Sequence, residues 1–112
     1  MSATSNPFHV AASHVEQMRQ AVLYTDGVLS ARTKVLGALL WSVSARCEPC
    51  LTHYARKAVE LGTTKEELSE MLAVASVMGG CVGETWALKA LAAAKPTVTA
   101  DGPREESCCA HP

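Results

Sequence analysis

Apolar residues recur at helical spacing along most of this chain. From residue 15 onward they fall three or four positions apart, the period of a helix with one buried face. The stripes are interrupted at turn-forming residues, namely Asp26-Gly27, Gly62 and Gly79-Gly80. No segment shows the alternation of a half-buried strand. The pattern predicts an all-α domain of about five helices, whose short loops favour antiparallel neighbours.

Capping residues mark the expected helix starts. Ser13 with Glu16 and Thr64 with Glu67 each fit a capping box, and Ser30 is the expected cap of an apolar helix between them. After Lys95 the composition changes to proline, threonine, glycine and charged residues. We therefore predict three parts: an N-terminal arm, a helical domain and a flexible tail that contains cysteines (1–12, 13–95 and 96–112).

The central stretch from Arg46 to His53 carries the most distinctive chemistry. Cys47 and Cys50 are separated by two residues, and Pro49 is tolerated only near a helix start, so the helix is expected to begin at Cys47 or the next residue. Orphan N–H groups, the helix dipole and Arg46 favour a thiolate there. Such settings lower a cysteine pKa from about 8.5 to roughly 3.5–7.5. One sulfur can then attack a partner while the other resolves the mixed disulfide.

Several neighbours are candidates for moving a proton. His53 follows Cys50 by three residues and could accept its proton or stabilise its thiolate, or it packs at a subunit interface. Glu48 suits the helix dipole, with an acid/base role as the alternative. Tyr54 is a packed tyrosine or a substitute proton donor. Glu84 is a solvated carboxylate or part of the same proton relay.

The remaining cysteines raise separate questions. The chain has five cysteines, an odd number, and its polar N-terminus lacks the apolar core of a signal peptide, which argues against a disulfide scaffold. Cys81 is expected to be a buried structural cysteine, with a third redox thiol as the alternative. Cys108 and Cys109 lie on the tail, where packing does not explain them. They could relay electrons between the central pair and an outside reductant, or the tail is dispensable.

A metal site is the main alternative to redox chemistry. Cys47, Cys50 and His53, joined by Cys108, Cys109 or His111, could bind zinc or another soft metal. A helical oligomer without catalysis is a further possibility.

Net charge and hydropathy limit the classes of partner that we expect for this protein. The net charge of −1 gives no strong case for nucleic acid or an anionic membrane. No apolar run reaches the roughly 18 residues of a membrane span, so a soluble cytoplasmic protein is expected. No nucleotide or flavin motif is present, so no cofactor is expected and electrons would arrive through thiols.

Motifs between about Arg32 and Ala94 carry a family resemblance. They are the apolar helix 33–45, Cys47-Glu48-Pro49-Cys50, Ala58-x-x-x-Gly62-Thr63-Thr64-x-Glu66-Glu67 and Val77-Met78-Gly79-Gly80. With these motifs the chain resembles the carboxymuconolactone decarboxylase and AhpD-like (alkylhydroperoxidase D) family. The resemblance implies an all-α fold that assembles into trimers or hexamers. It also implies a redox-active cysteine pair that reduces peroxides or passes electrons to a peroxiredoxin, and that a thiol reductant protein reduces again.

The resemblance leaves three functional points open. The decarboxylase branch acts on a lactone and lacks the cysteine pair, so both cysteines favour the redox branch. A thioredoxin-like pair would attack with Cys47, whereas AhpD is usually assigned the second cysteine, here Cys50. The family's relay glutamate corresponds to Val35 and its relay histidine to Tyr54, with His53 one residue earlier. Because one residue rotates a helical side chain by about 100°, the family's relay is not carried over intact.

Overall fold

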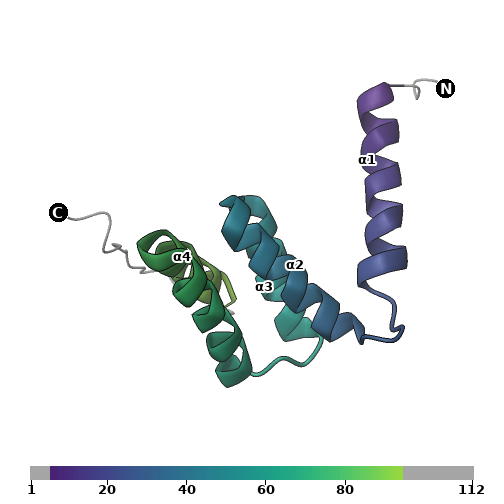
Figure 1. Cartoon of the computed structure of the whole chain (residues 1–112). Helices are drawn as coiled ribbons and strands as arrows, with labels where there is room; N and C mark the ends of the chain where they lie inside the picture. Colours follow the sequence, from purple (N-terminus) through teal and green to yellow (C-terminus); the bar gives the residue numbers. More distant parts are fainter. Residues whose placement is uncertain (1–5, 95–112) are drawn as a thin grey trace.

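Only helices and their connections occur in residues 6–94, the part of the chain described by the computed structural model (Figure 1). The predicted all-α fold is therefore confirmed. The elements are α1, the π-helix η1, α2, α3 and α4 (Pro7–Met18, Arg19–Leu23, Ala31–Ala45, Glu48–Glu60 and Lys65–Ala94).

The hydrophobic core lies where α2, α3 and α4 pack against one another. The predicted apolar stripe of α2 is confirmed, since Val35 and Leu39 are fully buried. The α3 side of the core is built from Leu51 and small alanines, which allow a close approach between helices. Burying a valine or leucine side chain contributes about 1.5–3 kcal/mol, so this shared face stabilises the domain. The buried members of the core are Val35, Leu36, Leu39, Val43, Leu51, Tyr54, Ala55, Ala58, Leu68, Leu72, Ala87 and Ala90.

Two predicted helix caps are confirmed. The Ser30 side chain accepts a hydrogen bond from the N–H of Thr33 at 3.1 Å, at the start of α2. At the start of α4, the Glu67 N–H donates to the Thr64 hydroxyl at 3.0 Å, and the Thr64 N–H donates to the Glu67 carboxylate at 2.9 Å. These reciprocal bonds form the capping box.

The N-terminal helix begins earlier than predicted. The expected cap at Ser13 is wrong, because Ser13 lies inside α1. The helix starts at Pro7, and the Asn6 side chain accepts a hydrogen bond from the N–H of Phe8 at 2.9 Å. Proline at the first helical position and asparagine at the cap are both strong start signals. No residue of α1 is buried, and the helix stands apart from α2, α3 and α4 (Figure 1).

A sharp kink at Gly80 divides α4, which confirms the predicted break at Gly79-Gly80. Gly80 has φ 60° and ψ −139°, a conformation open mainly to glycine. Eight residues of straight helix would span about 12 Å. Instead, the backbone at Gly83 lies so close to the Ala75 carbonyl that an added Cβ would collide with its oxygen. The two arms of α4 are therefore folded back on each other.

This kink bears on the membrane prediction. By length and composition alone, the 30-residue α4 could cross a membrane, so the expectation that no apolar stretch reaches that length is wrong. The glycines at 79 and 80 predict two separate helices here, neither of them long enough to span a membrane. In the structure, residues of both arms, including Leu68 and Leu91, line the same cavity of about 450 Å³. The folded-back element is not one straight span.

The close approach at Gly83 leads to a stability prediction. Gly83→Ala forces the arms of α4 apart and should lower the free energy of unfolding by about 1–3 kcal/mol. Gly37→Ala is the matched control, because Gly37 is exposed in α2 with nothing near its missing Cβ. It should raise that free energy by about 0.5–1 kcal/mol. Urea unfolding at one protein concentration measures both, and equal effects would contradict the folded-back arrangement.

Candidate redox site

The turn between α2 and α3 positions the cysteine pair. The N–H of Cys47 donates to the Ser42 carbonyl at 3.0 Å, and the N–H of Arg46 donates to the Val43 carbonyl at 3.1 Å. These two bonds define a Schellman motif, in which the residue after the helix adopts a left-handed conformation. The chain therefore reverses sharply, and Cys47 becomes the N-cap of α3.

The left-handed residue of this turn is unusual. The equivalent turn after α3 has glycine there, Gly62 with φ 99°, as the sequence predicts for a helix stop. The turn before the cysteines has Arg46 with φ 56°, and among residues 6–94 it is the one non-glycine residue with a positive φ. A left-handed conformation costs a residue with a side chain roughly 1–2 kcal/mol. Backbone strain of this kind clusters at functional sites.

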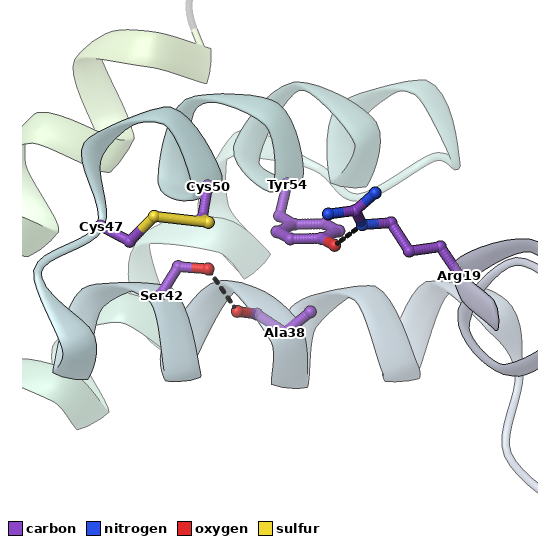
Figure 2. The surroundings of a disulfide bond; sticks show 6 residues. All are labelled: Arg19, Ala38, Ser42, Cys47, Cys50 and Tyr54. Atoms are coloured by element: carbon purple, nitrogen blue, oxygen red, sulfur yellow. Dashed lines mark hydrogen bonds between the residues drawn. A yellow bond between two sulfur atoms is a disulfide. The ribbon is translucent and has the colours of Figure 1, made fainter. Parts of the chain in front are cut away.

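Cys47 and Cys50 form a disulfide across the first turn of α3 (Figure 2). Their Cα atoms are 5.3 Å apart, and both side chains are half-buried. The predicted position of Cys47 at the helix start is confirmed. Cys50 also packs against the hydrophobic core. The pair thus joins the exposed end of α3 to the interior of the domain.

A buried serine lies beneath this disulfide. Ser42 is 0% exposed, and its hydroxyl donates to the Ala38 carbonyl at 2.8 Å. Figure 2 shows its side chain on the face of α2 that is turned toward the two sulfur atoms. Ser42 is not among the residues predicted from the sequence. The available signal was a hydroxyl inside an otherwise apolar stripe, between Leu39 and Val43.

The π-helix η1 connects the N-terminal segment to α3. The N–H of Tyr24 donates to the Arg19 carbonyl at 3.2 Å, an i to i−5 bond that brings these residues to neighbouring positions. Arg19 Nε donates to the Tyr54 hydroxyl at 3.0 Å, and the Tyr24 hydroxyl lies 2.8 Å from His53 Nε2. Two consecutive residues of α3 are therefore held by Arg19, the first residue of η1, and by Tyr24, the residue that follows it.

Electrostatic effects strengthen the contact between Arg19 and Tyr54. The hydrogen bond that Arg19 donates to the Tyr54 hydroxyl raises the pKa of Arg19, and the Glu16 carboxylate, 3.0 Å away, adds to the effect. Burial is the main reason that the pKa of Tyr24 is raised, so its hydroxyl stays protonated to higher pH than usual. Sequence reasoning missed Arg19 and Tyr24, because pairing between residues about 30 positions apart leaves no local pattern.

The predicted proton carriers occupy different places around the pair. Tyr54 is buried, and Figure 2 shows its hydroxyl pointing away from the disulfide toward Arg19. His53 is exposed on the outer side of α3, in a groove that it shares with Glu48 and that neither cysteine lines. Glu84 is exposed on the second arm of α4. Their catalytic roles, and those of Cys47 and Cys50, stay predictions.

The other predicted cysteine positions have mixed outcomes. Cys81 is exposed, so the expectation of a buried structural cysteine is wrong; it directly follows the kink at Gly80, where the chain turns at the surface. Cys108, Cys109 and His111 lie outside the described residues. Within residues 6–94, no group of three or more His, Cys, Asp or Glu residues is arranged to bind a metal.

The orientation of Tyr54 leads to a prediction that separates anchoring from proton relay. Tyr54→Phe removes the acceptor of Arg19 and should increase hydrogen exchange of residues 19–24 several-fold. It should leave the alkylation rate of the reduced cysteines unchanged, because the hydroxyl faces away from them. Exchange and alkylation, both read by mass spectrometry, measure the two effects. Tyr24→Phe is the control that removes the neighbouring bond, and slower alkylation in Tyr54→Phe would indicate a relay instead.

Comparisons with known proteins agree with this fold. The carboxymuconolactone decarboxylase family model matches residues 11–93. The crystal structure of a carboxymuconolactone decarboxylase family protein from Legionella pneumophila, in its apo form, superposes with a TM-score of 0.71 at 32% identity, covering 78% of this chain and 77% of that one. An uncharacterized protein of Cupriavidus necator is 39% identical over 67 residues, 60% of this chain and 59% of the relative. The chain therefore belongs to the carboxymuconolactone decarboxylase family.

Proposed function

We propose that this protein is a thiol–disulfide oxidoreductase of the AhpD-like type, which reduces a peroxide or a protein disulfide with Cys47 and Cys50. The observation that carries the proposal is the disulfide across the first turn of α3. Membership of a family whose AhpD-like branch uses such a pair supports it. The strained turn at Arg46 adds support, because it costs stability and holds Cys47 at the helix end.

In the peroxide reaction, the thiolate of one cysteine attacks the terminal oxygen of the peroxide. The O–O bond breaks, an alcohol leaves with one proton, and the cysteine becomes a sulfenic acid. The second thiol then displaces water from this sulfenic acid and the disulfide forms. An external dithiol returns two electrons and two protons, which restores both thiols.

In the disulfide reaction, the same thiolate attacks a sulfur of the substrate and releases one substrate thiolate. The second cysteine then attacks the mixed disulfide and releases the other. The two reactions share the Cys47–Cys50 product and differ in the oxidant.

The end of α3 favours a thiolate at Cys47. An N-cap side chain normally accepts an N–H from the second or third residue of its helix, and Cys47 makes no such bond in the disulfide form. Pro49 has no N–H, so the third residue, Cys50, has the N–H available for the Cys47 sulfur after reduction. Arg46 adds a positive charge beside it, while the Glu48 carboxylate opposes it.

The redox proposal predicts a reversible two-thiol oxidation. One equivalent of peroxide, or of a small disulfide, should convert Cys47 and Cys50 from thiols to one disulfide, and a dithiol should restore both. Quantitative alkylation followed by mass spectrometry reads each cysteine separately. Comparing the rates with the two oxidants identifies the preferred substrate class.

Single substitutions complete the test. Cys47→Ser and Cys50→Ser should each abolish turnover, and the variant that accumulates a mixed disulfide or sulfenic acid retains the attacking cysteine. Cys81→Ser is the matched control, since Cys81 is an exposed cysteine of α4 outside the Cys47–Cys50 disulfide. Full turnover in both pair variants would rule out the proposed function.

We also propose that the protein works as a homo-oligomer. The support is α1, which has no buried residue. Its large apolar side chains are uncovered, since Phe8 is 73% exposed and Met18 is 60% exposed. A lone helix of this length is marginal in water, so packing against another copy would stabilise it.

An assembly of this kind can be broken at α1. Met18→Glu should lower the molar mass measured by light scattering, because it places a charge on the apolar side of the helix. Gln17→Glu introduces the same charge at the adjacent exposed position and should leave the mass unchanged. A wild-type protein that is monomeric at micromolar concentration would contradict the oligomer.

A further inference from the structure

The hydroxyl of Ser42 is the feature that the proposed reaction does not yet use. It is a polar group with 0% exposure inside a helix that otherwise presents apolar side chains to the core. Burying a hydroxyl is unfavourable unless it is hydrogen-bonded, and here the Ala38 carbonyl accepts that bond. What needs an explanation is why a hydroxyl occupies this buried position.

That bond is redundant for the fold. In an α-helix the Ala38 carbonyl already accepts the backbone N–H of residue 42, so the hydroxyl adds a second donor to a satisfied acceptor. Serine bonds of this kind, back to the preceding turn, slightly destabilise a helix. An alanine would fill the position without leaving any buried group unpaired. The helix itself therefore does not require the hydroxyl.

The surroundings of Ser42 connect it to the cysteine pair. Its carbonyl accepts the N–H of Cys47 at 3.0 Å, which fixes the start of α3 directly over it. The Schellman motif typically brings the side chains of these two positions into contact. Figure 2 shows the Ser42 side chain between α2 and the disulfide, on the side of the sulfur atoms.

Reduction changes what the hydroxyl faces. Two electrons and two protons from the thiol reductant convert the disulfide to two thiols, and loss of one proton leaves one thiolate. The Cys50 N–H favours this charge at Cys47, whereas a donor beside the Cys50 sulfur would favour it at Cys50. A half-buried thiolate at Cys50 lies against the core, where charge is poorly solvated unless a donor is present. A serine hydroxyl can rotate toward a new acceptor. Hydrogen bonds to a charged acceptor are roughly twice as strong as those between neutral groups.

We propose that the Ser42 hydroxyl rotates from the Ala38 carbonyl to the sulfur of Cys50 when the disulfide is reduced, and that it stabilises the Cys50 thiolate. The inference rests on the proposed redox function and adds a residue to it. The Ala38 carbonyl then serves as the resting acceptor in the oxidised protein, so the hydroxyl is paired in both states.

The test is the pH dependence of alkylation of the fully reduced, full-length protein. Iodoacetamide reacts with thiolates, and mass spectrometry reads Cys50 separately from Cys47. Ser42→Ala should raise the apparent pKa of Cys50 by about one unit, equivalent to about tenfold slower alkylation at a pH well below that pKa. Ser42→Thr keeps a hydroxyl and should retain most of the wild-type rate.

Two controls separate this effect from a packing change. Ser44→Ala alters an exposed serine of the same helix and should leave the Cys50 profile unchanged. Ser42→Ala should melt within a few degrees of the wild type in the oxidised form, because its hydrogen bond there is redundant.

The outcomes distinguish this inference from the redox proposal. If the pKa of Cys50 is low in the wild type and equally low in Ser42→Ala, the role of Ser42 is overturned and the redox proposal stands. If the pKa of Cys50 in the wild type is near that of an ordinary thiol, the role of Ser42 is also overturned, whether or not the protein reduces peroxide or disulfide. A lowered pKa that shifts in Ser42→Ala supports the inference, and absence of peroxide or disulfide turnover in the same preparation would then overturn only the redox proposal.

Discussion

One backbone hydrogen bond, from the N–H of Cys47 to the carbonyl of Ser42, organises the centre of this protein. It closes α2, turns the chain through a left-handed Arg46 and starts α3 at the first cysteine. A thiol at a helix N-cap, a second thiol one turn later and a hydroxyl beneath them all follow from that turn. Had the chain continued as one helix, the pair would lack the unpaired N–H groups of a helix start.

The core gives this turn a rigid base. α2 carries the largest buried apolar stripe, and α3 and α4 cover it with leucines and alanines. Gly83 allows the two arms of α4 to fold back on each other, and both arms contribute residues to the same core. Several large apolar side chains stay exposed, among them Phe8, Trp41, Val77 and Met78. A domain of this size therefore leaves apolar surface for a partner to cover.

The N-terminal segment is linked to α3 by polar contacts. Arg19 and Tyr24 reach consecutive residues of α3, so the position of η1 is tied to the helix that begins with the cysteines. An isolated surface ion pair such as Glu16–Arg19 contributes little, and its value here lies in orienting the guanidinium toward Tyr54. This arrangement uses Tyr54 as an anchor for a separate helix.

Local signals in the sequence by themselves determined the all-α class, the caps at Ser30 and Thr64, the stop at Gly62 and the helix start at Cys47. Each depends on a few neighbouring residues whose backbone preferences are strong. Tertiary structure alone decided the burial of Ser42 beneath the disulfide, the outward-facing hydroxyl of Tyr54 and the contacts of Arg19 and Tyr24. These depend on which helix faces are brought together by packing, and the same spacing of residues is compatible with several such arrangements.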